Sequence, residues 1–253
     1  MRHSNQPRTA RAVGVSATGP ATVAAMVQVP EPDRPPLVPF RWRRAAVGLV
    51  VLCATSAVVL GIRYHGDTAA GRLDAWAIDH LPWAVSSTSP VANALADAIS
   101  PWVDAVVAGV LAVAFAARRQ WKWLVLTLAG PALTGAITES AKHLVDRTIN
   151  GGLALPSGHT AGATSILVIL ALAVLTRVRA HVVPAGVVAA LAVTAGAAGV
   201  GLIMVSLDAH YPTDVVAGFC TAVVLTLGTA LLLDVSRPAA PARPSAPGGR
   251  TGR

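Results

Sequence analysis

Apolar residues fall in six long blocks along the chain, and most polar and charged residues lie between them. The blocks are 45–62, 102–117, 123–140, 160–176, 182–205 and 213–235. A helix needs about 20 apolar residues to cross a bilayer, whereas a membrane β-strand needs only about 9 to 11. The second block is short by this measure, so we expect it to extend back towards Ala98, with Asp104 inside it. The pattern predicts an all-α protein with six membrane-spanning helices.

Polar tails flank these blocks. Residues 1–40 and 236–253 are rich in Pro, Ala and Arg and have no sustained apolar period. This composition predicts two disordered tails around one membrane domain at 41–235. The first long apolar run begins only near Ala45, which argues against a cleaved signal peptide.

The distribution of charge predicts the orientation of the helices. The chain is 54% hydrophobic and 13% charged, whereas a soluble domain carries about 25% charged residues. Its net charge of +8 does not indicate nucleic-acid binding, because the basic residues lie between the apolar blocks rather than on one face. Sixteen of the 20 lysines and arginines lie before the first block, after the last block, or in the loops after the second and fourth blocks. The positive-inside rule therefore predicts that both termini are cytoplasmic and that the other three loops face outward.

The three outward loops hold most of the polar residues that could react. The first, 63–101, includes an amphipathic stretch that could lie along the membrane interface, RLDAWAIDHLPW. In the second loop, Ser157 and Gly158 directly precede an apolar helix, where backbone N–H groups and the helix dipole favour an anion. His159 adds an imidazole beside them. Lys142 and Arg147 are candidate cations on the same rim.

The third outward loop offers a histidine paired with a carboxylate. His210 and Asp214 are four residues apart, which is one turn if the last helix begins near Tyr211. An aspartate so placed can fix the tautomer of the imidazole and stabilise its charged form. A helix cap is another interpretation of Asp214, and pairing with Glu139 is another interpretation of Lys142.

Together these residues suit phosphoryl transfer without a metal cofactor. One imidazole would attack phosphorus to form a phosphohistidine, while the other protonates the leaving alkoxide. The cations and N–H groups would neutralise charge on the phosphate oxygens. Cys53 and Cys220 lie singly inside apolar blocks, so neither a metal site nor a disulfide framework is indicated.

At these residues the sequence resembles the type 2 phosphatidic acid phosphatases (PAP2), whose fold and site are shared with vanadium haloperoxidases. The three motifs of that family have the forms K-x6-R-P, P-S-G-H and S-R-x5-H-x3-D. Residues 156–159 match the second motif completely, and residues 210–214, HYPTD, match the end of the third. Lys142 matches the start of the first motif. The resemblance covers roughly residues 73–233.

The resemblance implies an enzyme that hydrolyses a phosphomonoester or a diphosphate of a membrane lipid on the outer face of the cell membrane. It implies a site without a cofactor, in which each residue has a definite role. The roles are nucleophile for His210, orienting carboxylate for Asp214, general acid for His159, phosphate ligand for Lys142, and phosphate-binding donors for Ser157 and Gly158.

The sequence departs from the family pattern at both motif arginines. The arginine and proline of the first motif fall on Ile149 and Asn150, and the serine and arginine of the third fall on Ile203 and Met204. Arg147 holds the position of an extra arginine in the commoner GRPRP form, so we expect it to reach the phosphate instead. Losing one donor of an anion site can lower the rate by about 10² to 10³.

These departures keep a second hypothesis open, in which the protein binds lipid phosphates without catalysis. A solute transporter is disfavoured, since the chain shows no inverted repeat. In addition, the ionisable residues collect at one rim rather than at mid-membrane, where transporter sites lie.

Overall fold

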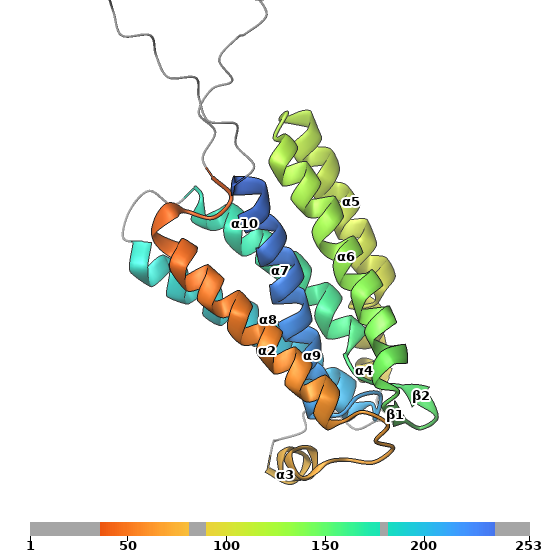
Figure 1. Ribbon diagram of the computed structural model, residues 1–253. Coiled ribbons are helices and arrows are strands. Elements are labelled where there is room, and N and C mark those ends of the chain that lie inside the picture. Colours follow the sequence, from red (N-terminus) through yellow and green to blue (C-terminus); the bar gives the residue numbers. More distant parts are fainter. Residues whose placement is uncertain (1–35, 81–89, 178–181, 236–253) are drawn as a thin grey trace, which may run out of the picture. The chain divides into compact units, whose positions relative to one another are not determined.

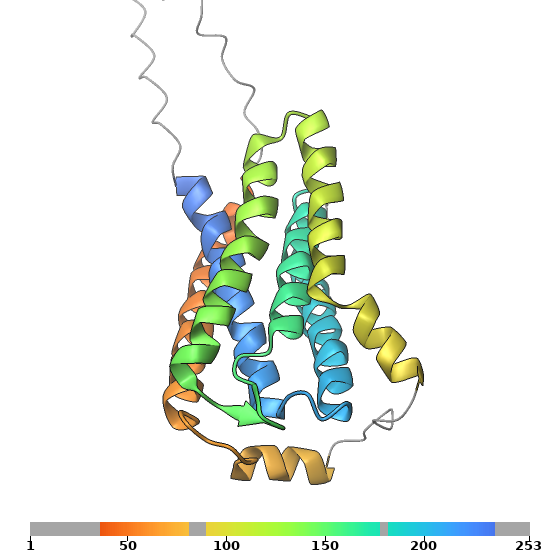
Figure 2. The ribbon, with the colours of Figure 1, turned by 90° about the vertical axis from the view of Figure 1, so that its right-hand side faces the viewer.

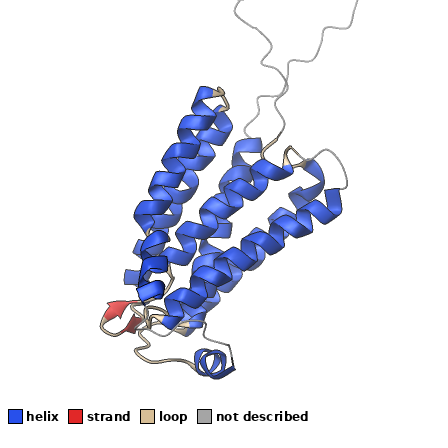
Figure 3. Cartoon of the chain, turned by 180° about the vertical axis from the view of Figure 1, so that it is seen from behind, coloured by secondary structure: helices blue, strands red, loops and turns tan. Residues whose placement is uncertain are grey.

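The computed structural model describes residues 36–80, 90–177 and 182–235. The predicted tail at 236–253 and most of the one at 1–40 lie outside these residues, as do the last three residues of the amphipathic stretch. Within the described part the regular elements are helices apart from one pair of two-residue strands, β1 (Thr148–Ile149) and β2 (Gly152–Leu153) (Figure 3). The predicted all-α class is therefore confirmed.

Six helices in the described part are long and apolar enough to cross a membrane. They are α2 (Arg43–Arg63), α4 and α5 taken together (Pro90–Ala98 and Pro101–Ala117), α6 (Trp121–Val145), α7 (Gly158–Leu175), α8 (Val182–Ser206), and the continuous run of α9 (Pro212–Ala222), the π-helical η2 (Val223–Leu227) and α10 (Gly228–Val235). The apolar part of the second span begins at Asn93, so it extends even further back than predicted. Two short helices remain, η1 (Phe40–Trp42) and α3 (Arg72–His80).

α7 is a central helix of the bundle and packs against α5, α6, α8 and α9. Its buried face includes small polar residues, and the Ser165 hydroxyl is 2.8 Å from that of Thr226 in η2. Opposite them, a side chain at Gly130 would lie only 3.2 Å from Thr226 Cγ2. In a bilayer, small residues and hydroxyl pairs of this kind let helices approach closely.

The first span packs mainly on the last one. α2 contacts α9, η2 and α10, and it lies alongside this continuous run in Figure 1. Asp234 in the last turn of α10 closes this pairing at one end of the bundle. Its carboxylate accepts the backbone N–H groups of Leu37 (3.0 Å) and Val38 (2.9 Å) and lies 3.3 Å from a guanidinium nitrogen of Arg43.

The three loops predicted to face outward all lie at the other end of the bundle. Figure 2 shows α3 and the β1–β2 hairpin across that end, where α2 and α6 finish and α7 and α9 begin. Backbone hydrogen bonds join the loops to one another: Gly66 to Val145 (2.8 Å), Thr148 to Asp67 (3.0 Å) and Ser157 to Asp214 (2.9 Å). The predicted meeting of the two motif-bearing loops is therefore observed, while their placement outside the cell stays a prediction.

Candidate active site

His210 lies in the turn before α9 and faces Asp214 across one helical turn. Pro212 occupies the first turn of α9, where its missing N–H and fixed φ suit a helix start. The Nδ1 atom of His210 is 3.8 Å from Oδ2 of Asp214, an ion-pair separation longer than a hydrogen bond. His210 is 8% exposed and Asp214 is fully buried. The predicted proximity of the two side chains is therefore observed, while their catalytic roles stay a prediction.

Asp214 also caps α9. Its Oδ2 atom accepts the backbone N–H of Tyr211 at 2.8 Å, and its Oδ1 atom accepts Nη1 of Arg147 at 2.6 Å. Because both oxygens have fixed donors, the carboxylate cannot turn without breaking a hydrogen bond. The side chain of Asp214 therefore caps α9 and also lies beside His210.

Arg147 does not take the position expected of a phosphate ligand. The residue is fully buried. Its Nη1 atom bonds to Asp214 and, at 2.7 Å, to the Thr213 hydroxyl, while Nη2 bonds to Asp74 Oδ2 at 2.5 Å. Both terminal nitrogens are therefore engaged by protein oxygens. This placement corrects the expectation that Arg147 reaches the substrate.

Ser157 also differs from its expected role. It is the N-cap of α7, and its hydroxyl accepts the backbone N–H of Thr160 at 3.4 Å. Its own N–H donates to the carbonyl oxygen of Asp214, so it is not available to a phosphate. Ser157 thus joins the second motif to the third, and the expected phosphate contact of its N–H is corrected.

Gly158, His159 and Lys142 meet at the start of α7. The ammonium nitrogen of Lys142 lies 3.8 Å from the point where a Cβ of Gly158 would stand, which places it beside the first residue of α7. Lys142 pairs with Oε2 of Glu139 at 3.2 Å. His159 interacts electrostatically with both His210 and Lys142. The structure therefore brings four of the predicted residues near one another from three segments of the chain: Lys142, His159, His210 and Asp214.

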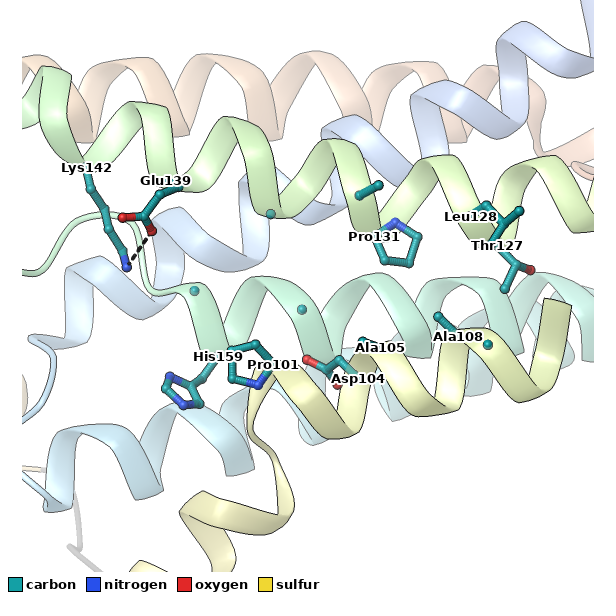
Figure 4. A pocket seen from close by; sticks show the side chains of 15 residues that line it. Pro101, Asp104, Ala105, Ala108, Thr127, Leu128, Pro131, Glu139, Lys142 and His159 are labelled. Carbon is teal, nitrogen blue, oxygen red and sulfur yellow. Dashed lines mark hydrogen bonds and ion pairs between the residues drawn. The ribbon is translucent and has the colours of Figure 1, made fainter.

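A cavity of about 500 Å³ extends from Lys142 and His159 into the helix bundle. It lies between α5, α6 and α7, and Figure 4 shows Lys142 and His159 at one end of it and Leu128 at the other. Between the ends, its wall consists mostly of small and apolar residues, to which Asp104 adds a carboxylate. Its volume is within the range of about 300 to 1,000 Å³ that small-molecule sites occupy.

Sequence reasoning missed a group of residues around Arg147. Asp74 of α3 is fully buried and accepts the backbone N–H (2.9 Å) and hydroxyl (2.7 Å) of Thr213. The rings of Tyr64 and Tyr211 lie on the guanidinium of Arg147, each with its centroid 4.3 Å from Cζ. Asp74 stood in an amphipathic stretch that the sequence only placed at the interface, so no local signal pointed to this contact.

The two positions that lack a motif arginine are filled differently. Ile149 pairs with Gly152 in the hairpin, and Asn150 turns the chain at φ 50° while its side chain donates to the carbonyl of Asp208 at 3.0 Å. Met204 is 2% exposed within α8. Neither position supplies a charge to the site.

The six candidate membrane-spanning helices of the described part indicate a multi-pass membrane protein. Residues 137–237 match the family model described as the PAP2 superfamily. The matched region contains Lys142, the PSGH segment and the HYPTD segment. No curated protein and no solved structure matches the chain.

Proposed function

We propose that the protein hydrolyses a phosphomonoester or a diphosphate of a membrane lipid, through a phosphohistidine at His210, on the non-cytoplasmic face. The observation that carries this proposal is the cavity, because it joins the polar group of Lys142 and His159 to an apolar groove between three helices. A molecule that fits both parts has a phosphate at one end and a hydrocarbon chain at the other. Membrane lipids with a terminal phosphate have this form.

The first chemical step uses His210 as the nucleophile. Its Nε2 atom attacks phosphorus, the bond from phosphorus to the leaving oxygen breaks, and His159 donates a proton to that oxygen. The imidazole ring of His210 gains positive charge as the N–P bond forms. Asp214, 3.8 Å from Nδ1, stabilises that charge.

The second step returns the enzyme to its starting state. His159, now neutral, accepts a proton from a water molecule as that water attacks the phosphohistidine. The N–P bond breaks, inorganic phosphate leaves, and His159 is protonated again. With a lipid diphosphate the same steps leave a lipid monophosphate as the first product.

Lys142 and the start of α7 would hold the phosphate. The ammonium group supplies a full charge, and the first N–H groups of α7 point towards an anion at the helix N-terminus. Lys142 must then exchange its contact with Glu139 for a phosphate oxygen. Because isoleucine and methionine replace the two motif arginines, we expect a slower reaction than a complete charge clamp would allow.

The same two replacements favour a second candidate function, binding of lipid phosphates without turnover. Here Lys142 and the cavity would recognise the same ligand, and His210 would not form a covalent intermediate. The two functions differ in a single observable, the transfer of phosphate to His210.

The test is phosphate release by the full chain, purified in detergent, from phosphatidic acid, phosphatidylglycerol phosphate and a polyprenyl diphosphate. His210→Ala should abolish release, and labelled phosphate should be trapped on the wild-type chain only. His143→Ala is the matched control, because that imidazole lies at the same end of the bundle but is 69% exposed. Folded wild-type protein that binds these lipids without releasing phosphate would favour the binding function.

A further inference from the structure

We propose that Asp74 and Arg147 are positioning residues that hold Asp214, and through it His210, in the geometry needed to attack phosphorus. This inference rests on the proposed function and deepens it, because it adds to the site two residues that do not touch substrate. It assigns Arg147 a different task from the phosphate contact expected of a motif arginine.

The contacts form a closed ring around the start of α9. Arg147 joins Oδ1 of Asp214 (2.6 Å) to Oδ2 of Asp74 (2.5 Å). The other oxygen of Asp74 returns to Thr213, the neighbour of Asp214, through the backbone N–H and the hydroxyl. Three segments therefore fix this turn of α9: α3, the chain after α6, and α9 itself.

Two aromatic side chains pack on the guanidinium of Arg147. Tyr64 follows the last turn of α2 and is 2% exposed, and Tyr211 is the residue before α9. Each aromatic centroid lies 4.3 Å from Cζ of Arg147, a distance at which a guanidinium and an aromatic face attract each other. The aromatic contacts therefore restrict the orientation of the guanidinium, in addition to its hydrogen bonds.

The arrangement decides which oxygen of Asp214 faces His210. With Oδ1 held by Arg147, Oδ2 is the oxygen that lies beside Tyr211 N–H and His210 Nδ1. Without Arg147, the carboxylate of Asp214 would keep only its hydrogen bond to Tyr211 N–H. It could then rotate more easily, and Oδ2 could move away from the imidazole. Attack on phosphorus depends on this orientation, because Nδ1 must face the carboxylate while Nε2 faces the substrate.

Stability alone is a weak explanation for such a group. Two carboxylates and a guanidinium lose their hydration when they are buried, and apolar residues that fill the same space often stabilise a fold as well or better. The burial of these three charged side chains is better explained by the side chain that they orient. Here the group that it orients is the carboxylate beside the proposed nucleophile.

The decisive variant is the double substitution Asp74→Asn with Arg147→Met. Arg147→Met alone leaves two buried carboxylates without their cation and could prevent folding. Removing one negative and one positive charge together keeps the net charge of the ring unchanged, while Asp214 still loses its anchor. The amide that Asp74→Asn introduces has no cation to bind in this variant, and its carbonyl oxygen can still accept from Thr213.

The expected result is a fall in kcat of about 10- to 100-fold, as is common when an orienting partner of a reacting group is lost, with KM unchanged. Single-turnover labelling should show that formation of the phosphohistidine has slowed. Arg147→Lys should retain an intermediate kcat, because one ammonium can contact one carboxylate but not bridge two. Arg63→Met is the matched control, since Arg63 ends α2 at the same end of the bundle with a 64% exposed side chain.

Three results would overturn the inference. A higher KM with unchanged kcat would make Arg147 a phosphate ligand, and an unchanged kcat and KM would give the ring no part in the reaction. A loss of activity that follows a loss of folded protein in every variant, Arg147→Lys included, would make the ring structural. If the wild type and Arg63→Met both fail to release phosphate, the proposed function fails as well, which separates that failure from the other three.

Discussion

The backbone N–H of Ser157 donates to the backbone carbonyl of Asp214 at 2.9 Å, so the PSGH and HYPTD segments are joined directly. The contact depends on a close approach of α9 to the chain before α7. Gly218 provides it, because a Cβ at that position would overlap the carbonyl oxygen of Ser157.

Gly218→Ala should therefore push the two segments apart. We expect a loss of about 1 to 3 kcal/mol in the free energy of unfolding, as in other overpacked interiors, together with a lower kcat. Thermal unfolding in detergent and phosphate release measure the two effects. Gly199→Ala is the control, since a Cβ there meets nothing within 4 Å. Equal stability of the two variants would show that the contact tolerates a side chain.

Lys142 and Glu139 make opposite predictions for substrate binding. Lys142→Ala should lower kcat/KM by about 10² to 10³, since Lys142 is the one lysine or arginine in the described wall of the cavity. Glu139→Gln should lower KM, because the ammonium no longer has a carboxylate partner at 3.2 Å. Initial rates over a range of lipid concentrations distinguish the two. A higher KM in Glu139→Gln would mean that Glu139 holds Lys142 in its working position.

The apolar part of the cavity should select for chain length. Ala108 lines the cavity and is 7% exposed. Ala108→Phe should lower kcat/KM for a long-chain lipid phosphate by about tenfold or more, which corresponds to a binding loss of about 1.4 kcal/mol. A short-chain phosphomonoester should be unaffected. Val106→Phe is the control on the same helix, because Val106 is 66% exposed outside the cavity. Equal losses for both substrates would place the lipid chain elsewhere.

Asp234 should matter for stability but not for catalysis. The two carboxylate oxygens of Asp234 accept the N–H groups of Leu37 and Val38, and Asp234→Asn replaces one of these oxygens by an NH₂ group, which cannot accept. The substitution also removes the negative charge that faces Arg43. Loss of a buried hydrogen-bond partner costs about 1 to 3 kcal/mol. Thermal unfolding should show this loss while KM stays constant. Asp67→Asn serves as the comparison, because its side chain is 41% exposed.

The six spans could be predicted because an apolar run of about 20 residues has few other stable forms in a bilayer. Lys142, His159, His210 and Asp214 could be placed together for a related reason: helices of that length return the chain to the same face at fixed intervals. Both arguments depend on periodicity along the chain. Neither depends on the direction of a particular side chain.

Arg147 shows where such reasoning stops. Its distance from Lys142 suggested a phosphate ligand, but Asp146 at the end of α6 has φ 52°, in the left-handed region. The chain changes direction at that residue, and the guanidinium is directed to Asp74, 73 residues earlier. Asp74 lies in α3, a short helix that carries no recognisable motif. No pattern in the neighbouring sequence therefore predicts its contact with Arg147.

The pairing of α2 with α9, η2 and α10 has a consequence for assembly. α2 packs mainly on α9, η2 and α10, which are synthesised last. The residues just before α2 are also held by Asp234, in the final turn of α10. The residues of α2 are synthesised long before Asp234, so we expect α2 to wait for its main partner until synthesis is almost finished. We expect truncation within the last span to leave the first one accessible to membrane quality control, although all the residues of α2 are present.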